Sequence, residues 1–246
     1  MVSISCTCIA CGWQIELLPP FDREGSICTN CTSTWRNRAT LLSISESLGY
    51  GSIPLAQWPE NWAACGAGFD DSPVLFSKLP QKTIYTNTHL GKFPHLDLSD
   101  VPDRYIASLN FVVCGDVLEH VEPRKLDKAI SGIAKLLVDG GFAIISVPIA
   151  PEEFSGEFYP DAQNVEVVNA GHVRWQNALG EWIDDYQPEF HGGTGQVLAY
   201  RRFSEQIFVE SFNRNGFETV IRAPTNEKLG VPAIENSGVF VVWKLG

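Results

Sequence analysis

The sequence predicts an α/β fold in which parallel strands form one sheet with helices packed on both faces. Residues 111–114 are a short aromatic and β-branched run, which is typical of a strand buried on both faces. Residues 123–138 repeat apolar side chains at three- and four-residue steps, which indicates a helix with one stripe on the sheet. Gly140 and Gly141 end that helix, and residues 142–147 form a second apolar strand. Together they predict one βαβ unit.

The length and charge of the chain limit its function classes. At 246 residues and 44% hydrophobic content, it suits one α/β domain with an appendage. The net charge of -11 repels phosphate backbones and argues against a nucleic-acid partner. The sequence lacks a run of eighteen apolar residues and a basic, then apolar, N-terminal signal, so we expect a cytoplasmic protein without a membrane partner. The oligomeric state is not indicated.

Five cysteines gather in the first 31 residues. The pairs Cys8-x2-Cys11 and Cys28-x2-Cys31 have the spacing of a four-thiolate zinc ribbon. Four thiolates leave no open coordination position, so a Zn²⁺ held here would be structural. Cys6 could replace Cys8 as a ligand or remain a free thiol. The alternative, a disulfide pair, is disfavoured because no secretory signal precedes it.

The chain divides into three parts: a zinc ribbon over 1–32, a connecting helix over 33–52 and the main domain over 53–246. The helix has Ser33 at its expected cap position and an apolar stripe behind it. Two of its arginines are either anion contacts or charges on a solvated face paired with acidic side chains: Arg36 and Arg38.

A ligand cleft is expected beyond the carboxyl ends of the parallel strands. Residues 116–120 and the segment after Pro148 follow two such strands and should line it. At these residues, the run DVLEHV, followed by a helix, LLVDGG and FAIISVP, resembles class I S-adenosylmethionine-dependent methyltransferases of the type 11/12 kind. The resemblance extends over residues 110–148.

This resemblance implies a Rossmann-like doubly wound sheet of seven strands, mixed because the last strand is antiparallel. It also implies S-adenosylmethionine as cofactor and a methyl acceptor that is a small molecule or a glycan, methylated on oxygen or nitrogen. The cofactor contacts it implies after strand 111–114 are Gly115, Asp116, Val117 and His120.

Further cofactor positions follow from the same resemblance. Gly66-x-Gly68 is a sparse form of the family's glycine-rich loop, where glycines let the backbone approach the methionine part. After the second strand, Thr86 and Asn87 replace the usual ribose-binding carboxylate. Of Asp70 and Asp71, one could contact the amino group, with a cap of the following helix as the alternative role. Asp97 could lie at the adenine end, with a turn or cap as the alternative.

Residues 151–200 follow the second strand of the βαβ unit and are irregular and rich in aromatic and acidic side chains, which indicates a substrate lid. Methyl transfer needs a base only when the acceptor must lose a proton. The candidates are His120, His172 and His191, each of which could instead be a packed or surface side chain.

Two other functions stay open. An RNA methyltransferase with a zinc-ribbon recognition module would need a basic surface on the ribbon. A non-catalytic module that kept the sheet would explain the sparse Gly66-x-Gly68 loop and the missing ribose carboxylate.

Overall fold

The computed structural model describes residues 3–191 and 197–245. Its main sheet has six strands in the order β14-β15-β6-β5-β3-β4. Their bounds are β3 Asn61–Phe69, β4 Thr83–Thr88, β5 Leu109–Gly115, β6 Leu137–Ser146, β14 Phe217–Arg222 and β15 Val239–Lys244. The four strands β4, β3, β5 and β6 are parallel, whereas β15 is antiparallel to both of its neighbours. The expected mixed sheet with an antiparallel last strand is therefore confirmed.

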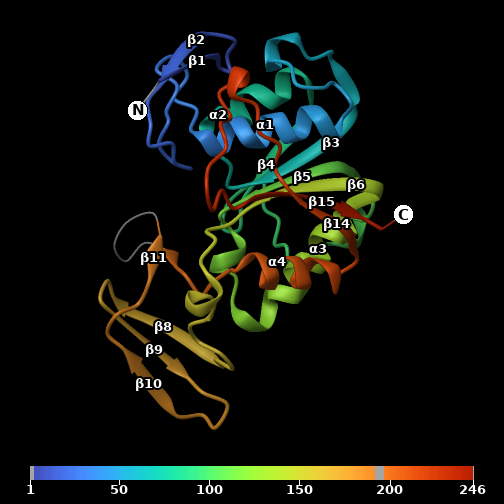
Figure 1. The fold of residues 1–246 in the computed structure, drawn as a ribbon. Helices are drawn as coiled ribbons and strands as arrows, with labels where there is room; N and C mark the ends of the chain where they lie inside the picture. The colour runs from blue at the N-terminus through green and yellow to red at the C-terminus, as the bar shows by residue number, and fades with distance from the viewer. Residues whose placement is uncertain (1–2, 192–196, 246) are drawn as a thin grey trace.

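Helices cover both faces of this sheet, which makes the fold doubly wound (Figure 1). The helices α1 Trp35–Ser47 and α2 Pro73–Lys78 lie on one side, and α3 Leu126–Leu136 and α4 Glu205–Asn213 lie on the other. Alternate residues of β5 show why, since Phe111 and Val113 belong to the first core and Val112 and Cys114 to the second. A strand with apolar side chains on both faces needs a helical layer on each.

The seventh strand of the expected sheet is reduced to a single parallel bridge between His89 and His95, beyond β4. Residues 94–98, expected to lead into that strand, are mostly irregular apart from the bridge at His95. The second strand is longer than expected, so Thr86 and Asn87 lie inside β4 and not after it.

The βαβ unit has the expected order but different boundaries. Three residues of 3₁₀ helix, Pro123–Lys125, precede α3, which ends at Leu136 before the two glycines. Strand β6 begins at Leu137, and Gly140, with φ of 72°, lies in a bulge of that strand. The remaining 3₁₀ turns are Leu55–Gln57, Leu79–Gln81, Asp103–Tyr105, Leu118–His120, Glu152–Phe154 and Glu227–Leu229.

The N-terminal segment, residues 3–34, is called the Cys module below. Its hairpin pairs β1 Ile4–Thr7 with β2 Gln14–Leu17. Its buried side chains belong to the same core as α1 and the sheet. The cap of α1 is Thr34, which forms a capping box with Asn37, so the expected cap at Ser33 is wrong by one residue.

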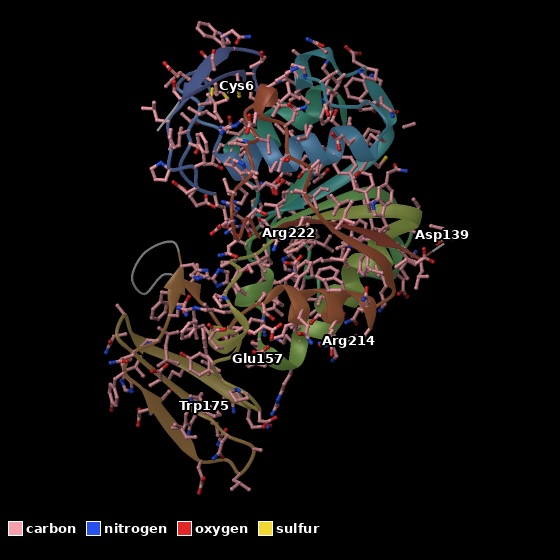
Figure 2. All side chains as sticks on the ribbon, viewed as in Figure 1. Cys6, Asp139, Glu157, Trp175, Arg214 and Arg222 are labelled. Carbon is pink, nitrogen blue, oxygen red and sulfur yellow. The ribbon has the colours of Figure 1, made fainter. Side chains whose placement is uncertain are left out.

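The expected lid forms a separate small β-structure. Three antiparallel strands, called the meander below, are β8 Asn164–Asn169, β9 His172–Gln176 and β10 Trp182–Asp185. Two short pairs connect it to the main domain: β7 Gly156–Glu157 with β13 Arg201–Arg202, and β11 Phe190–His191 with β12 Val197–Leu198. Figure 2 places Trp175 in the meander and Cys6 in the Cys module, at opposite ends of the molecule. Residues 192–196 of the expected lid lie outside the described residues.

Within the described part of the chain, none of the helices has the length and apolar character needed to span a membrane.

Candidate functional site

A cavity of about 980 Å³ opens at the carboxyl ends of the parallel strands. Phe69, Gly115 and Ser146, which end β3, β5 and β6, all line it. This is the position where open α/β sheets bind ligands, because the strand-to-helix loops diverge there. The volume lies at the upper end of the range of roughly 300–1,000 Å³ that is usual for ligand sites.

The cavity gathers part of the residue set expected from the sequence. Seven of the expected residues line it: Asp70, Asp97, Gly115, Asp116, Val117, His120 and His191. Five others are not among the lining residues: Gly66, Gly68, Thr86, Asn87 and His172. The site therefore depends more on the β5 loop than on the glycine-rich segment.

Asp116 is held by two arginines from the N-terminal part of the chain. Its backbone has φ of 55°, in the left-handed region, and its carboxylate pairs with Arg23 and, at 2.9 Å, with Nη1 of Arg36. Burial lowers the pKa of Arg36, but Asp116 and Glu24 outweigh this and leave its pKa raised, so the guanidinium stays charged. A Cβ on Gly115 would lie 3.3 Å from Arg36 Nη1, so glycine leaves room for this approach.

The loop after β3 carries a second carboxylate, the half-buried Asp71. It accepts a hydrogen bond from the Tyr85 hydroxyl, and burial raises the pKa of Asp71 to about 7. Its carboxylate lies directly against Gly68, where any Cβ would overlap it. The Asp71 amide donates to Oδ1 of Asn87 at 3.0 Å. Gly68 and Asn87 therefore shape the loop around Asp71, and neither lines the cavity.

The next part of the wall combines apolar and acidic groups. Leu90, Leu96 and Leu98 line the cavity beside Asp97. Oδ1 of Asp97 accepts from both the amide and the hydroxyl of Ser99, so the carboxylate also organises its own turn. Asp70 contacts His89 and does not cap α2, whose N-cap is Ser72.

His120 and His191 line the cavity and form one cluster with Glu119, which is buried behind them and is not among the lining residues. The 3₁₀ turn that carries Glu119 and His120 is braced by buried Arg201, which donates to the Leu118 and Val121 carbonyls. The His120 and His191 rings meet edge to face with centroids 5.0 Å apart. The β11 strand thus brings a lid histidine to the βαβ loop.

Three of the other predicted residues have different surroundings. His172 lies in the meander, where Nε2 contacts Asp184 at 2.6 Å and its ring stacks on Tyr186. Gly66 faces Phe111, and a Cβ there would approach the ring to 2.3 Å, so this glycine serves packing. Thr86 is exposed on β4.

The four cysteines Cys8, Cys11, Cys28 and Cys31 converge, with all sulfurs within 4.8 Å of one another. Two sulfur pairs, Cys8–Cys31 and Cys11–Cys28, are 3.8 Å apart. Tetrahedral Zn²⁺ with bonds of about 2.3 Å separates its sulfurs by roughly 3.8 Å, so the cluster fits that ion. Cys6 is not in the cluster, which answers the choice between Cys6 and Cys8 on geometric grounds.

The polar groups that surround the four sulfurs also fit a metal site. The Ser33 hydroxyl lies 3.3 Å from both Cys8 and Cys31 Sγ, as an outer hydrogen-bond partner would. Arg38 is fully buried and donates to the carbonyls of Ser26, Ser33 and Gly230. Arg38 therefore fixes the backbone segments that carry these carbonyls. Of the two arginines considered from the sequence, Arg36 lines the cavity and Arg38 does not.

The sequence did not indicate the roles of two further residues, Arg23 in the cavity wall and Glu119 beside it. Arg23 lies in the segment between the two cysteine pairs, and it approaches Asp116 only in the folded protein. Glu119 was visible within the DVLEHV run, but no local pattern indicates that its carboxylate points inward.

No protein-family model matches the sequence. A search of curated proteins gives no match either. Among solved structures, the chain is similar to the 1,6-didemethyltoxoflavin-N1-methyltransferase of Burkholderia thailandensis, with 14% identity and a TM-score of 0.46 over 86% of this chain and 78% of that one.

Two further solved structures show the same degree of similarity. The glycopeptide N-methyltransferase MtfA, complexed with S-adenosylmethionine, has 13% identity and a TM-score of 0.47 over 83% of this chain and 94% of that one. The sugar N-methyltransferase KedS8 of a Streptoalloteichus species has 13% identity and a TM-score of 0.45 over 74% and 81%. Similarities this low carry no information on activity or substrate.

Proposed function

We propose that the protein is an S-adenosylmethionine-dependent methyltransferase that acts on oxygen or nitrogen of a small-molecule or carbohydrate-like acceptor. The observation that carries this proposal is the Asp116 site. A carboxylate in left-handed backbone geometry follows β5 and lies against two arginines in a cavity at the carboxyl edge of the sheet. That edge is where a doubly wound sheet presents its ligand contacts.

The cavity chemistry fits the two ends of this cofactor. Arg36 supplies a permanent positive charge for the methionine carboxylate, and Asp116 and Asp71 supply acceptors for its ammonium group. The leucine wall with Asp97 offers an apolar surface and one carboxylate for the adenosine end. We assign to Gly115 and Val117, which flank Asp116, backbone contacts with the cofactor. Gly66, Gly68, Thr86 and Asn87 would support the loop without touching the cofactor.

The sulfonium of the cofactor supplies an activated methyl group for an in-line displacement. The residues of this chain then have to align the acceptor and exclude water. His120 and His191 are the groups placed to accept a proton from the acceptor, because both line the cavity and imidazole titrates near neutral pH. His172 is not part of this proposal, since it lies in the meander.

The size of the cavity supports a small acceptor beside the cofactor. The RNA alternative gains no support from the charges, because the net charge is -11. We also propose that residues 1–32 are a structural zinc module, residues 33–52 its connecting helix and residues 53–246 the catalytic domain.

The test is calorimetric titration of the zinc-replete protein with S-adenosylmethionine and with its demethylated product. We expect micromolar binding of both, weakened at least tenfold by Asp116→Asn. The exposed Asp103, substituted by Asn, is the matched control and should bind like the wild type. A folded protein that binds neither compound would overturn the proposal and favour the non-catalytic module.

A further inference from the structure

Three acceptor groups converge at the lid end of the cavity: the Glu119 carboxylate and the rings of His120 and His191. His120 Nε2 lies 3.9 Å and His191 Nδ1 lies 3.6 Å from Glu119 Oε1. These distances exceed a hydrogen bond, so the three groups face one another without direct pairing.

The tautomer of His120 follows from its other nitrogen. Nδ1 lies 2.8 Å from the carbonyl oxygen of Leu198, which can only accept, so Nδ1 carries the hydrogen. In the neutral ring, the lone pair is then on Nε2 and points toward Glu119. Ligand histidines in metal sites are oriented by the same kind of outer hydrogen bond to a carbonyl.

The orientation of His191 has the same cause. Its Nε2 lies 3.3 Å from Oε1 of Glu189, whose other oxygen is paired with Arg202 at 2.6 Å. A carboxylate held by an arginine accepts, so Nε2 donates and the lone pair of neutral His191 is on Nδ1, toward Glu119.

Glu119 completes the set of acceptors. Its side chain is 1% exposed, and neither carboxylate oxygen has a hydrogen-bond partner among the described residues. A buried carboxylate without a partner is costly, and two imidazole lone pairs facing it add no donor. A positive charge between the three groups would satisfy all of them at once.

We propose that Glu119, His120 and His191 bind a divalent transition-metal ion, separate from the four-cysteine cluster. Two imidazoles and one carboxylate are the donor set of Zn²⁺ and Fe²⁺ sites that keep positions open, whereas Mg²⁺ and Ca²⁺ prefer oxygen alone. Ligands at about 2.0–2.1 Å from a tetrahedral ion lie roughly 3.4 Å apart. The observed 3.6 and 3.9 Å need only small side-chain rotations.

The site opens on the cavity, because His120 and His191 both line it next to Val197 and Tyr200. With the ion bound, the histidine lone pairs are occupied and do not accept the acceptor's proton. The open position of the ion would instead bind an oxygen or nitrogen of the methyl acceptor and lower the pKa of that group. This role rests on the proposed function, whereas metal binding itself does not.

The test is a count of bound metal. The protein is purified with Zn²⁺, dialysed against micromolar Zn²⁺ and analysed for zinc per chain by mass spectrometry. The two clusters predict two ions per chain in the wild type and one in Glu119→Gln or His191→Ala. Glu119→Gln keeps the shape of the side chain, and its amide can donate to a histidine lone pair. The ion retained by the cysteines shows that each variant is folded.

Glu122→Gln is the matched control, because Glu122 is close in sequence but half exposed and paired with Lys125. It should retain both ions. Titration of Co²⁺ into wild type that carries one zinc ion, in the cysteine cluster, should give visible bands without the intense thiolate charge-transfer absorption, and the bands should be absent in Glu119→Gln. One zinc per wild-type chain and no Co²⁺ bands would overturn the proposal and indicate a proton shared with His191. Two ions retained by Glu119→Gln would overturn it as well. Cofactor calorimetry is a separate readout, so failure of methyl transfer would not be mistaken for failure of the metal site.

Discussion

The Cys module and the meander are both additions to the same sheet, but they are joined to it in different ways. The Cys module shares its buried residues with α1 and the sheet, and it places Arg23 and Glu24 in the cavity. The meander packs, together with the segments that flank it, around a separate small cluster that includes Tyr159, Val173 and Leu198, and it leaves Trp182 46% exposed.

This difference predicts that damage to the two additions has different consequences. A segment whose apolar side chains belong to the common core unfolds with that core, whereas a segment with its own small cluster can open locally. The Cys module should therefore govern global stability and cofactor binding, and the meander should govern neither. Among the described residues of the lid, those that line the cavity are His191, Val197 and Tyr200, at its β11–β12 end.

The largest effect is expected from Cys28→Ser, which removes one thiolate from the four-cysteine cluster. Cys28 is fully buried in the shared core. Zinc binding in small modules stabilises folding by about 10–16 kcal/mol, comparable to or above the roughly 5–15 kcal/mol net stability of a domain. We expect loss of zinc from the cluster and loss of cooperative thermal unfolding. Cys65→Ser, outside the cluster, is the control; a Cys28→Ser protein that melts like the wild type would contradict a structural zinc.

The next effect concerns Asp71, the half-buried carboxylate that accepts a hydrogen bond from Tyr85, a member of the core shared with the Cys module. The folded protein keeps Asp71 protonated up to about pH 7, while the unfolded chain loses that proton near pH 3.8. Stability should therefore fall as the pH rises between these values. Urea unfolding at pH 5 and pH 8 should show the wild type losing ~3 kcal/mol more than Asp71→Asn. Exposed Asp100, substituted by Asn, should leave the wild-type pH dependence unchanged.

Arg36→Met tests the contribution of the connecting helix to the cofactor site. The substitution removes the charge proposed to bind the methionine carboxylate and leaves Asp116 with Arg23 alone. We expect at least tenfold weaker binding of S-adenosylmethionine, or about 1.4 kcal/mol, by calorimetry. Arg104→Met, in an exposed turn, is the control. Unchanged affinity in Arg36→Met would mean that Arg36 only holds Asp116.

A smaller effect is expected from Tyr159→Phe. This variant tests whether a change beside the meander leaves the rest of the protein unaffected. The Tyr159 hydroxyl donates to Oδ2 of Asp185 at 2.7 Å, and its loss should cost about 1 kcal/mol. Hydrogen exchange should accelerate in β9 and β10, while the melting temperature and cofactor affinity stay unchanged. Tyr186→Phe, at a ring that is 69% exposed, is the control. A global loss of stability in Tyr159→Phe would show that the meander belongs to the common core.

The elements that were predicted correctly are those whose pattern lies within a short stretch of sequence. The strand at 111–114, the helix after it and the spacing of the four cysteines each depend on neighbours within a few turns of chain, so periodicity and spacing reveal them. The same reasoning placed Asp116 and His120 at a ligand edge, because the carboxyl ends of parallel strands share that edge.

Features that depend only on the direction in which a side chain points were predicted less well from the sequence. Gly66 and Gly68 were expected at the cofactor, yet Phe111 and Asp71 occupy the space beside them. His172 and His191 were equivalent lone histidines in an irregular segment. Antiparallel pairing of β11 with β12 brings His191 to the cavity, and pairing of β9 with β8 and β10 keeps His172 in the meander.

The sequence by itself therefore determined the doubly wound sheet, the cysteine cluster and the edge of the sheet where the cavity opens, since each follows from patterns of adjacent residues. Tertiary structure alone decided which charges meet there. Arg23 reaches Asp116 across 93 residues of chain, and His191 faces Glu119 across a comparable separation. Contacts at such distances depend on how whole elements pack, and packing depends on the summed burial of many side chains, which no short motif contains.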